Sequence, residues 1–258
     1  MSSEPQTHGS DIKGVVFIDL ETSGLPDKDA KNWWKIPHYS DLEKYNNCRI
    51  IQICAMLCDV DSLTPLEIKS TLIKANDFEI SQQSINVHGI SRERTLEEGK
   101  EFAQCMQDDI YPLFLKANYI AAHNIAFDIN VLKSELMRGN FVDILNYMNN
   151  NMKEICTMKS TKRIVCAKGF KGRLKNPNLK ELYHFATGQS MEEHHDAEHD
   201  VINMHAAVKI LVERDGLQLY NANNNNNNNN NYNNNYNNDS NNNYNNNTVT
   251  AITTILQQ

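Results

Sequence analysis

The sequence predicts an α/β domain in which a sheet is flanked by helices, and three observations indicate this class. A continuous apolar run at residues 15–20, bounded by turn residues, is typical of a buried strand. Two strand-like runs, 49–60 and 65–74, follow it, so the first third of the chain is rich in strands. Apolar residues then recur at helical spacing in three later segments, 95–117, 125–138 and 197–212.

The first strand ends in two carboxylates. Asp19 and Glu21 lie two residues apart, so they point to one face of the strand while Leu20 points to the other. Like charges held side by side repel one another unless a cation lies between them. Carboxylate oxygens suit Mg²⁺ or Mn²⁺. The spacing alone is equally compatible with two solvated acids at a strand end.

Residues 26–47 form an irregular excursion after this strand end, and residues 61–64 a hairpin connection between the next two strands. The aromatic residues of the excursion are Trp33, Trp34, Tyr39 and Tyr45. Because it leaves from the acidic strand end, it could form a wall beside the site and stack bases. The alternative is that the two tryptophans pin the loop to the domain.

Helices and short strands alternate in the middle of the chain. Thr95 and Glu98 have capping-box spacing, which predicts a helix from Thr95 to about Ala117. A short strand at 119–122 is followed by a helix at 125–138, with Asn124 as its N-cap. The residues expected to face the core are Phe102, Met106, Ile110 and Leu113 in the first helix and Ile125, Ile129, Leu132 and Leu136 in the second. Asp128, taken alone, is a charge placed favourably at a helix start.

The last third is expected to hold two more helices. Residues 139–152 are polar and rich in Asn, which indicates a helix remnant and loop, and Asn178 and Gly188 bracket a short helix. In the final helix the apolar positions are Ala197, Val201, Met204, Val208 and Leu211. His195 and Asp200 are five residues apart, roughly 140° around one straight helix. To share a site, His195 must lie in the loop before the helix and Asp200 on its first turns.

The chain is acidic overall but contains one basic segment. The formal net charge is −7 and the pI about 5.7, which argues against a general nucleic-acid coat but not against a nuclease. The segment 159–175 concentrates basic residues: Lys159, Lys162, Arg163, Lys168, Lys171, Arg173 and Lys175. A track for a phosphate backbone is one interpretation, and a solvated charged face is the other.

Composition divides the chain into three parts. Residues 221–247 are nearly all Asn and offer almost nothing to bury. We therefore expect a flexible N-terminus at 1–13, one folded domain at 14–215 and a disordered Asn-rich, low-complexity tail at 216–258.

The six cysteines show neither a CxxC pair nor a framework spacing, and residues 1–13 are too short and polar for a signal peptide. We expect reduced thiols in an intracellular protein of the nucleus or cytoplasm, which is not secreted and does not engage a membrane. A zinc site built from Cys156, Cys166 and a histidine is an alternative use of two of them.

Three motifs occur in order along the chain: Asp19-x-Glu21-Thr22-x-Gly24, His123 to Asp128, and His195 to Asp200. With these motifs, residues 13–214 resemble the DEDD exonucleases of the histidine (DEDDh) branch, which includes the proofreading epsilon subunit of bacterial polymerase III. The resemblance implies an RNase H-like fold, a five-stranded mixed sheet flanked by helices, with residues 153–157 as its fifth strand. It also implies a 3′→5′ exonuclease that releases nucleoside 5′-monophosphates from single-stranded or frayed DNA, in proofreading or repair.

The resemblance assigns roles residue by residue. Two Mg²⁺ or Mn²⁺ ions, expected about 3.5–4 Å apart, would be held by Asp19, Glu21, Asp128 and Asp200. His195 would be the general base that takes a proton from the attacking water. The residues implied to contact the substrate are Thr22 through its main chain, Leu25 as a wedge, Phe127 against the terminal nucleotide, and His88 and His123. Partners would be nucleic acid 3′ ends; no feature of the sequence identifies a polymerase partner.

Other interpretations of these residues stay open at this point. The same site would serve a 3′→5′ exoribonuclease, and a catalytically inactive nucleic-acid-binding adaptor could share the fold. The His195-Asp196 pair also occurs in the all-helical HD phosphohydrolases, and His195 with His199 could chelate zinc on one helix. The last two require a largely helical chain, which the strand-rich first third disfavours.

Overall fold

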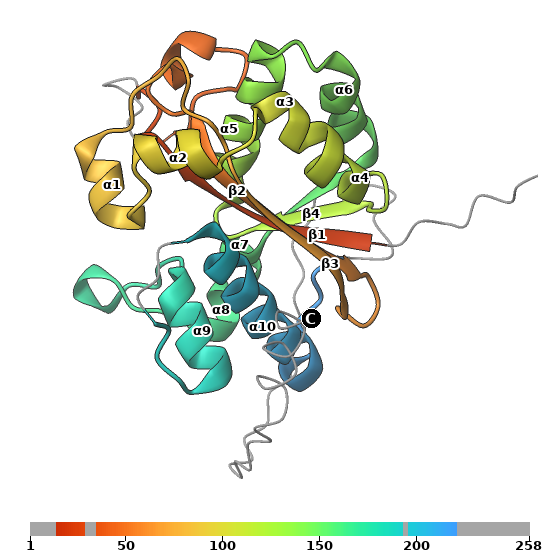
Figure 1. The fold of residues 1–258 in the computed structure, drawn as a ribbon. Helices are drawn as coiled ribbons and strands as arrows, with labels where there is room; N and C mark the ends of the chain where they lie inside the picture. The colour runs from red at the N-terminus through yellow and green to blue at the C-terminus, as the bar shows by residue number, and fades with distance from the viewer. Residues whose placement is uncertain (1–13, 29–34, 193–195, 221–258) are drawn as a thin grey trace, which may run out of the picture. The chain divides into compact units, whose positions relative to one another are not determined.

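The computed structural model describes residues 14–28, 35–192 and 196–220 (Figure 1). Residues 1–217 form one unit, which contains every described helix and strand, and residues 218–220 are the described part of a second unit. The folded unit extends two residues beyond the predicted boundary at 215, because Leu217 is buried and its N–H donates to Leu211 O. Residues 1–13 and 221–258 lie outside the described residues, so the flexibility expected there stays a prediction.

The sheet has five strands: β1 (Gly14–Thr22), β2 (Ile50–Asp59), β3 (Pro65–Leu72), β4 (Tyr119–Ala122) and β5 (Lys153–Cys156). Their order is β3-β2-β1-β4-β5. The pairs β1–β2 and β2–β3 are antiparallel, and β1–β4 and β4–β5 are parallel, so the sheet is mixed as predicted. β1 is the central strand, and its run from Val15 to Ile18 is completely buried.

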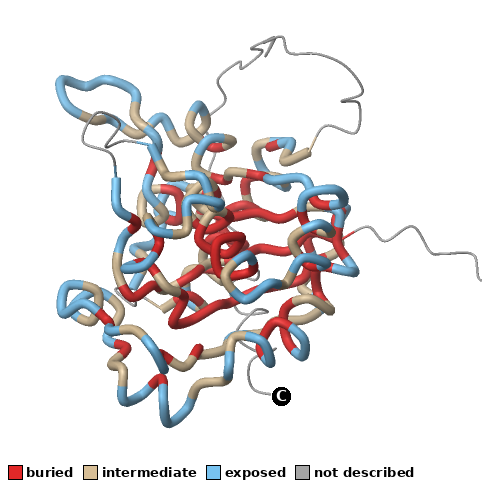
Figure 2. Tube along the Cα trace, turned by 90° about the horizontal axis from the view of Figure 1, so that it is seen from above, coloured by how far each residue is buried: buried red, intermediate tan, exposed pale blue. Residues whose placement is uncertain are grey.

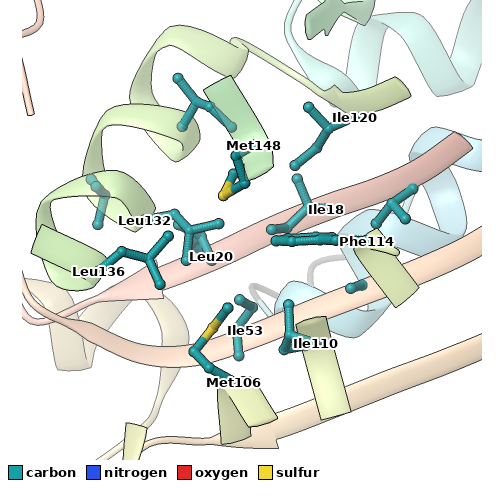
Figure 3. Packing of buried hydrophobic residues seen from close by; sticks show 14 of the residues in the cluster. Ile18, Leu20, Ile53, Met106, Ile110, Phe114, Ile120, Leu132, Leu136 and Met148 are labelled. Carbon is teal, nitrogen blue, oxygen red and sulfur yellow. The ribbon is translucent and has the colours of Figure 1, made fainter. Parts of the chain in front are cut away.

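One face of the sheet packs against four helices and a π-helical turn. These are α3 (Phe102–Cys105), the turn Met106–Ile110, α4 (Tyr111–Phe114), α5 (Ile125–Arg138) and α6 (Val142–Asn151). Figure 3 shows Ile18 and Leu20 of β1 facing Leu132 of α5 and Phe114 of α4 in this core. Figure 2 shows the strands buried at the centre and the exposed positions on the outer helices and loops.

The opposite face of β1 and β2 is covered by α10 (Ala197–Asp215), which in turn packs on α9 (Leu179–Thr187). The ring of Phe17 meets the buried His205 of α10 edge to face, with ring centroids 5.3 Å apart. His205 Nε2 donates to Leu63 O at 2.7 Å. Because side chains alternate along a strand, Asp19 and Glu21 lie on the same face as Phe17, the face that α10 covers.

The predicted helix from Thr95 to Ala117 is wrong in its first half. Ser91 caps a separate helix, α2 (Arg92–Glu98), by accepting from Arg94 N at 3.2 Å. Thr95 is buried within it, and its hydroxyl donates to Arg92 O. The chain turns away from helical geometry at Gly99, where an added Cβ would lie 2.3 Å from Thr95 O. Of the predicted core face, Met106, Ile110 and Leu113 are fully buried and Phe102 partly so.

Two other local expectations need correction, and one is confirmed. Residues 139–152 contain the ten-residue helix α6, which buries Ile144 and Met148, and are not merely a remnant. Asn124 does precede α5, but its φ is 78° and its side chain makes no capping hydrogen bond. Asn is chosen there because its short polar side chain tolerates the left-handed conformation. The capping box at the start of α9, with Asn178 and Glu181, is complete as predicted.

None of the helices in the described part of the chain is both long enough and apolar enough to cross a membrane.

Candidate active site

Three elements bring four carboxylates to the C-terminal end of β1. Asp19 and Glu21 come from β1 itself. Asp200 lies in the first turn of α10, on the face of the sheet that carries those two. Asp128 lies in the first turn of α5 and reaches β1 because β4, which leads into α5, pairs with β1 in parallel. The backbone N–H groups of Leu20 and of Asp128 itself hydrogen-bond the Asp128 carboxylate.

The electrostatics confirm that these groups are neighbours. Burial, together with the charges of Asp128, Asp200 and Glu21, raises the pKa of Asp19 well above its usual range. Burial and the nearby Asp200 raise the pKa of Glu21 to about 8. Burial and Asp196 raise the pKa of Asp200 to about 6, although His199 and Lys180 partly oppose this. Burial also raises the pKa of Asp128. Near neutral pH the cluster therefore cannot be fully ionised without a positive charge beside it.

The residues fit a divalent cation. One oxygen of Asp200, Oδ1, is buried and has no hydrogen-bond partner among the described residues. An unsatisfied carboxylate oxygen inside an acidic cluster is chemically suited to a hard cation. As the side chains stand, no three His, Cys, Asp or Glu groups within the described residues converge tightly enough to cage an ion. The described carboxylates are in electrostatic range of one another.

Two residues that the sequence reasoning missed hold α10 against the sheet. Asp196 is the N-cap of α10, and its Oδ1 accepts from Glu198 N at 2.9 Å. Its Oδ2 accepts from Gln52 Nε2 at 3.2 Å, and Gln52 Oε1 accepts from Ala197 N at 3.3 Å. Gln52 is buried on β2, directly opposite Glu21. Its amide therefore fixes the start of the helix that carries Asp200.

The pKa of Asp196 differs from those of the four acids. Burial raises it, but hydrogen bonds from Gln52 and from the backbone of α10 outweigh burial and lower it overall. Asp196 therefore stays ionised and adds negative charge next to Glu21 and Asp200. The only sequence signals for this arrangement were a lone Gln within an apolar strand and an Asp just before a helix.

The turn after β1 is firmly held. Thr22 is buried and its hydroxyl donates to Gly24 O at 2.8 Å. Ser23 N donates to Arg49 O, and Ser23 O accepts from Ser81 N just before α1 (Gln82–His88). Leu25 follows with 66% of its surface exposed. The main chain at position 22 is thus anchored, and Leu25 projects from the anchored turn.

The other predicted substrate residues are engaged by the protein itself. His123 Nε2 donates to Pro177 O at 3.0 Å, and its Nδ1 lies 3.0 Å from Thr157 Oγ1. Burial lowers the pKa of His123. His88 is the last residue of α1, and its Nδ1 accepts from Ile90 N. Phe127 is half-buried against the core.

His195, the predicted base, and Trp33 and Trp34 of the predicted wall lie outside the described residues. The later part of the excursion, around Tyr39 and the short 3₁₀ helix Leu42–Tyr45, packs on α5. Tyr39 N donates to Asn130 Oδ1, and Arg138 donates to Leu42 O. The part from 35 to 47 is therefore an integral wall of the domain on the α5 side.

The interpretation as an all-helical HD phosphohydrolase fails on the fold, because the protein contains a five-stranded sheet. His199 lies on α10, and His195, the other residue of the alternative zinc pair, lies outside the described residues. Cys156 and Cys166 join no group of three metal-binding side chains in the part of the chain that the structure describes.

The comparisons with known proteins agree with this architecture. The RNase T family model, described as exonuclease, matches residues 16–208. No curated protein matches the chain. Escherichia coli Exonuclease I in complex with a dT13 oligonucleotide is similar at 20% identity and a TM-score of 0.62, over 79% of this chain and 42% of that one. A moderately thermophilic Exonuclease I from Methylocaldum szegediense is similar at 21% identity and a TM-score of 0.60, over 79% of this chain and 41% of that one.

At this identity the solved structures show the fold, and the chain spans less than half of their length. The five-stranded mixed sheet and its flanking helices are the RNase H-like exonuclease fold, as predicted. The family model covers all three sequence motifs, from Asp19 to Asp200. The chain therefore belongs to the RNase T exonuclease family.

Proposed function

We propose that the protein is a 3′→5′ exonuclease that removes nucleoside 5′-monophosphates from the 3′ end of single-stranded or frayed DNA, in proofreading or repair. The observation that carries the proposal is the group of four carboxylates at the end of β1, whose pKa values are all raised by burial; the charges of neighbouring acids raise those of Asp19 and Glu21 further. The choice of DNA is supported by the similar solved structures, whose descriptions name dT13 and dA16 oligonucleotides.

The proposal includes two divalent ions, Mg²⁺ or Mn²⁺, held by Asp19, Glu21, Asp128 and Asp200. When bound, such a pair would supply an acidified water and positive charge for the attacked phosphate and the leaving oxygen. The fit is supported by the buried, unpartnered Oδ1 of Asp200 and by the all-oxygen donor set. One of the similar solved structures is described as the zinc-bound form of an Exonuclease I complex with single-stranded DNA.

The remaining roles belong to the chain's own groups. His195 accepts the proton of the attacking water, a task suited to a side chain with an ordinary pKa of about 6.5. The anchored main chain at Thr22 binds the terminal 3′-OH. The exposed Leu25 packs against the terminal bases and separates them. Gln52 and Asp196 position the start of α10, and thereby Asp200, without touching the substrate.

The test uses the purified protein with Mn²⁺ and matched 5′-labelled and 3′-labelled single strands of DNA and RNA. We expect a 5′-labelled DNA strand to shorten stepwise and a 3′-labelled strand to release labelled mononucleotide at once. A 3′-phosphate should block the reaction, and a 5′-phosphate should not. The Asp19→Asn variant is the control for contaminating nucleases.

Two outcomes would contradict the proposal. Cleavage of circular single-stranded DNA would identify an endonuclease. Faster degradation of the RNA strand than of the DNA strand would make the protein an exoribonuclease with the same chemistry.

A further inference from the structure

The segment 159–175, here called the basic arm, carries seven Lys and Arg residues and no Asp or Glu, in a chain of net charge −7. We propose that the basic arm binds the single strand behind the nucleotide being removed. In this proposal Phe170 stacks on a base, and Lys168, Lys171 and Arg173 contact phosphates. This inference rests on the proposed function, which places the 3′ end of the strand at the carboxylates. It adds the position of the nucleotides that precede that end.

Residues 168–174 of the arm form a hairpin, which follows the short helices α7 (Thr157–Ser160) and α8 (Lys162–Val165). Lys168 and Leu174 form a β-bridge, and Gly169 N donates to Arg173 O at 2.8 Å. At the tip, residues 170–172 make a 3₁₀ turn in which Lys171 and Gly172 both have positive φ. In Figure 1 the arm projects beyond α9, on its left. Its groups are therefore held in place before any ligand arrives, which lowers the entropy cost of binding.

The tip presents an aromatic ring among cations. Phe170 is 83% exposed, more than any other large hydrophobic side chain among the described residues. The ammonium of Lys171 lies 5.3 Å from the centroid of its ring. Proteins that bind single strands without sequence preference combine a basic track with aromatic side chains on which bases stack. The exposed Phe170 between Lys168 and Arg173 has both features.

The basic residues near the tip of the hairpin form no ion pair with another described residue. Among described residues, Lys168, Lys171 and Arg173 form no salt bridge, whereas Lys175 at the base of the arm pairs with Glu181 at 2.7 Å. The tip thus keeps its positive charge for a ligand, while the base is tied to α9. Phosphates are the ligand that complements a row of such cations in an otherwise acidic protein.

Both ends of the arm are held at His123, which precedes the helix that carries Asp128. The arm starts just after Thr157, the buried residue that contacts His123, and returns at Pro177, whose carbonyl accepts from the same ring. His123 lies between β4 and α5, five residues before Asp128. Lys180, three residues past Pro177, lowers the pKa of Asp200 through its charge. A strand whose 3′ end lies among the acids can therefore continue directly onto the arm.

The experiment measures binding of an oligo(dT) of about 30 nucleotides, longer than the roughly 4–16 nucleotides that single-strand-binding folds cover. Fluorescence anisotropy is recorded with EDTA, so that no hydrolysis occurs, at several salt concentrations. The variants are Phe170→Ala and the triple change Lys168→Gln, Lys171→Gln and Arg173→Gln. A triple control, Lys69→Gln, Arg94→Gln and Lys116→Gln, removes the same charge from residues elsewhere on the surface.

We expect Phe170→Ala to weaken binding about 5- to 150-fold and Phe170→Trp to restore it. The arm triple variant should flatten the slope of log K against log salt by about 2, because each single-strand phosphate contact contributes about 0.7. The control triple variant should bind like the wild type. Hydrolysis of a dinucleotide, which has a single nucleotide behind the one removed, should be the same in all variants.

Unchanged binding in both arm variants, or an equal loss in the control, would overturn the arm's role and show a solvated basic face. This outcome is separate from failure of the proposed function. If the wild type bound the oligonucleotide through the arm but released no nucleotide with Mn²⁺, the arm's role in binding would be supported and the exonuclease function would be contradicted. If the protein hydrolysed the strand but bound it equally well without the arm residues, the exonuclease function would be supported and the arm's role contradicted.

Discussion

At the scale of single residues, the acids at the end of β1 determine how the protein responds to pH. Their carboxyl groups have raised pKa values in the folded state, with Glu21 at about 8 and Asp200 at about 6. An unfolded chain would ionise them near pH 4. Between those limits the folded state binds more protons than the unfolded one, so these groups lower the free energy of unfolding as the pH rises.

This sign gives a prediction for metal binding. Without divalent ions, we expect the contribution of the cluster to the melting temperature to fall between about pH 5 and pH 8. Mg²⁺ should restore the melting temperature by several degrees at about pH 8 and by little at about pH 5, where protons compete for the same oxygens. In Asp19→Asn the pH dependence should be shallower and hydrolysis at least about 10²-fold slower. Thermal melts with Mg²⁺ or with EDTA at the two pH values measure the change in melting temperature. Equal stabilisation by Mg²⁺ at both pH values would show that these carboxylates are not its ligands.

His195 gives a second residue-scale prediction. A general base must be neutral, so kcat should fall as the pH drops through the pKa of this histidine. His195→Ala should slow hydrolysis about 10²–10⁴-fold and leave the Mn²⁺ affinity nearly unchanged, because the residue is assigned as a base and not as a ligand. His199→Ala is the matched control, since His199 lies on α10 beside Asp196. If His195→Ala weakened Mn²⁺ binding tenfold and kept its pH profile, the residue would be a ligand.

Sequence and structure agree on these residues to different extents. Asp19 and Glu21 were recognisable because alternation on a strand places both on one face. Asp128 and Asp200 were paired with them by motif order, since no local pattern joins residues so distant in the chain. The roles of Gln52 and Asp196 could not be predicted in this way. The function of a polar residue in an apolar strand is recognisable only when its hydrogen-bond partner across the fold is known.

At the scale of elements, the position of α10 depends on a few polar contacts at its first turn. Gln52 contacts both the N-cap Asp196 and Ala197 N. Gln52→Leu keeps the volume of the side chain but leaves the partly buried carboxylate of Asp196 without this donor. A displacement of about 1 Å at a reacting group can cost as much as 10²-fold in rate.

We therefore expect Gln52→Leu to lower kcat by about 10-fold or more while KM for a long oligonucleotide changes little. The free energy of unfolding should fall by about 1–3 kcal/mol, the cost of an unsatisfied buried group. Ser70→Ala is the control, because Ser70 Oγ contacts Gln52 at 3.4 Å. A rise in KM with unchanged kcat would show that Gln52 acts on substrate binding and not on the position of α10.

Element boundaries were predictable where a cap is local and not where tertiary contacts decide. The capping box of α9 lies within four residues and was correct. Thr95 and Glu98 have the same spacing, yet Thr95 is buried and the chain turns at Gly99. Lys100 then hydrogen-bonds through its backbone to Leu72, the last residue of β3, and to Lys74 just beyond it. Long-range pairing there overrides the local helix signal.

At the scale of the whole molecule, the folded unit closes with Leu217. Gly216 adopts a left-handed conformation with φ of 64°, and Leu217 folds back onto the end of α10. The α/β class and the single folded unit followed from pattern and composition. The mixed character of the sheet came from the resemblance, because no pattern in one sequence specifies which strands pair in parallel, and the strand order came only from the structure.

This closure predicts how truncation behaves. A chain ending after Leu217 should keep the melting temperature and the activity of the full chain, and it should be more soluble, because Asn-rich tracts favour β-aggregation. A chain ending after Asp215 should melt several degrees lower, since full burial of a Leu stabilises by about 1.5–3 kcal/mol. Thermal melts of the three chains compare them directly. A large loss of stability on removal of residues 218–258 would show that the tail packs.

The distribution of thiols along the fold has a practical consequence. Cys48, Cys58 and Cys105 are buried, and burial raises their pKa values to about 12; it also raises the pKa of the buried Cys54. Cys156 is half-buried, and Cys166 alone is exposed, within the basic arm. A maleimide dye should therefore react first at Cys166 in the natural sequence. A change in the emission of this dye would then report the binding of a single strand to the basic arm in real time, without an engineered cysteine.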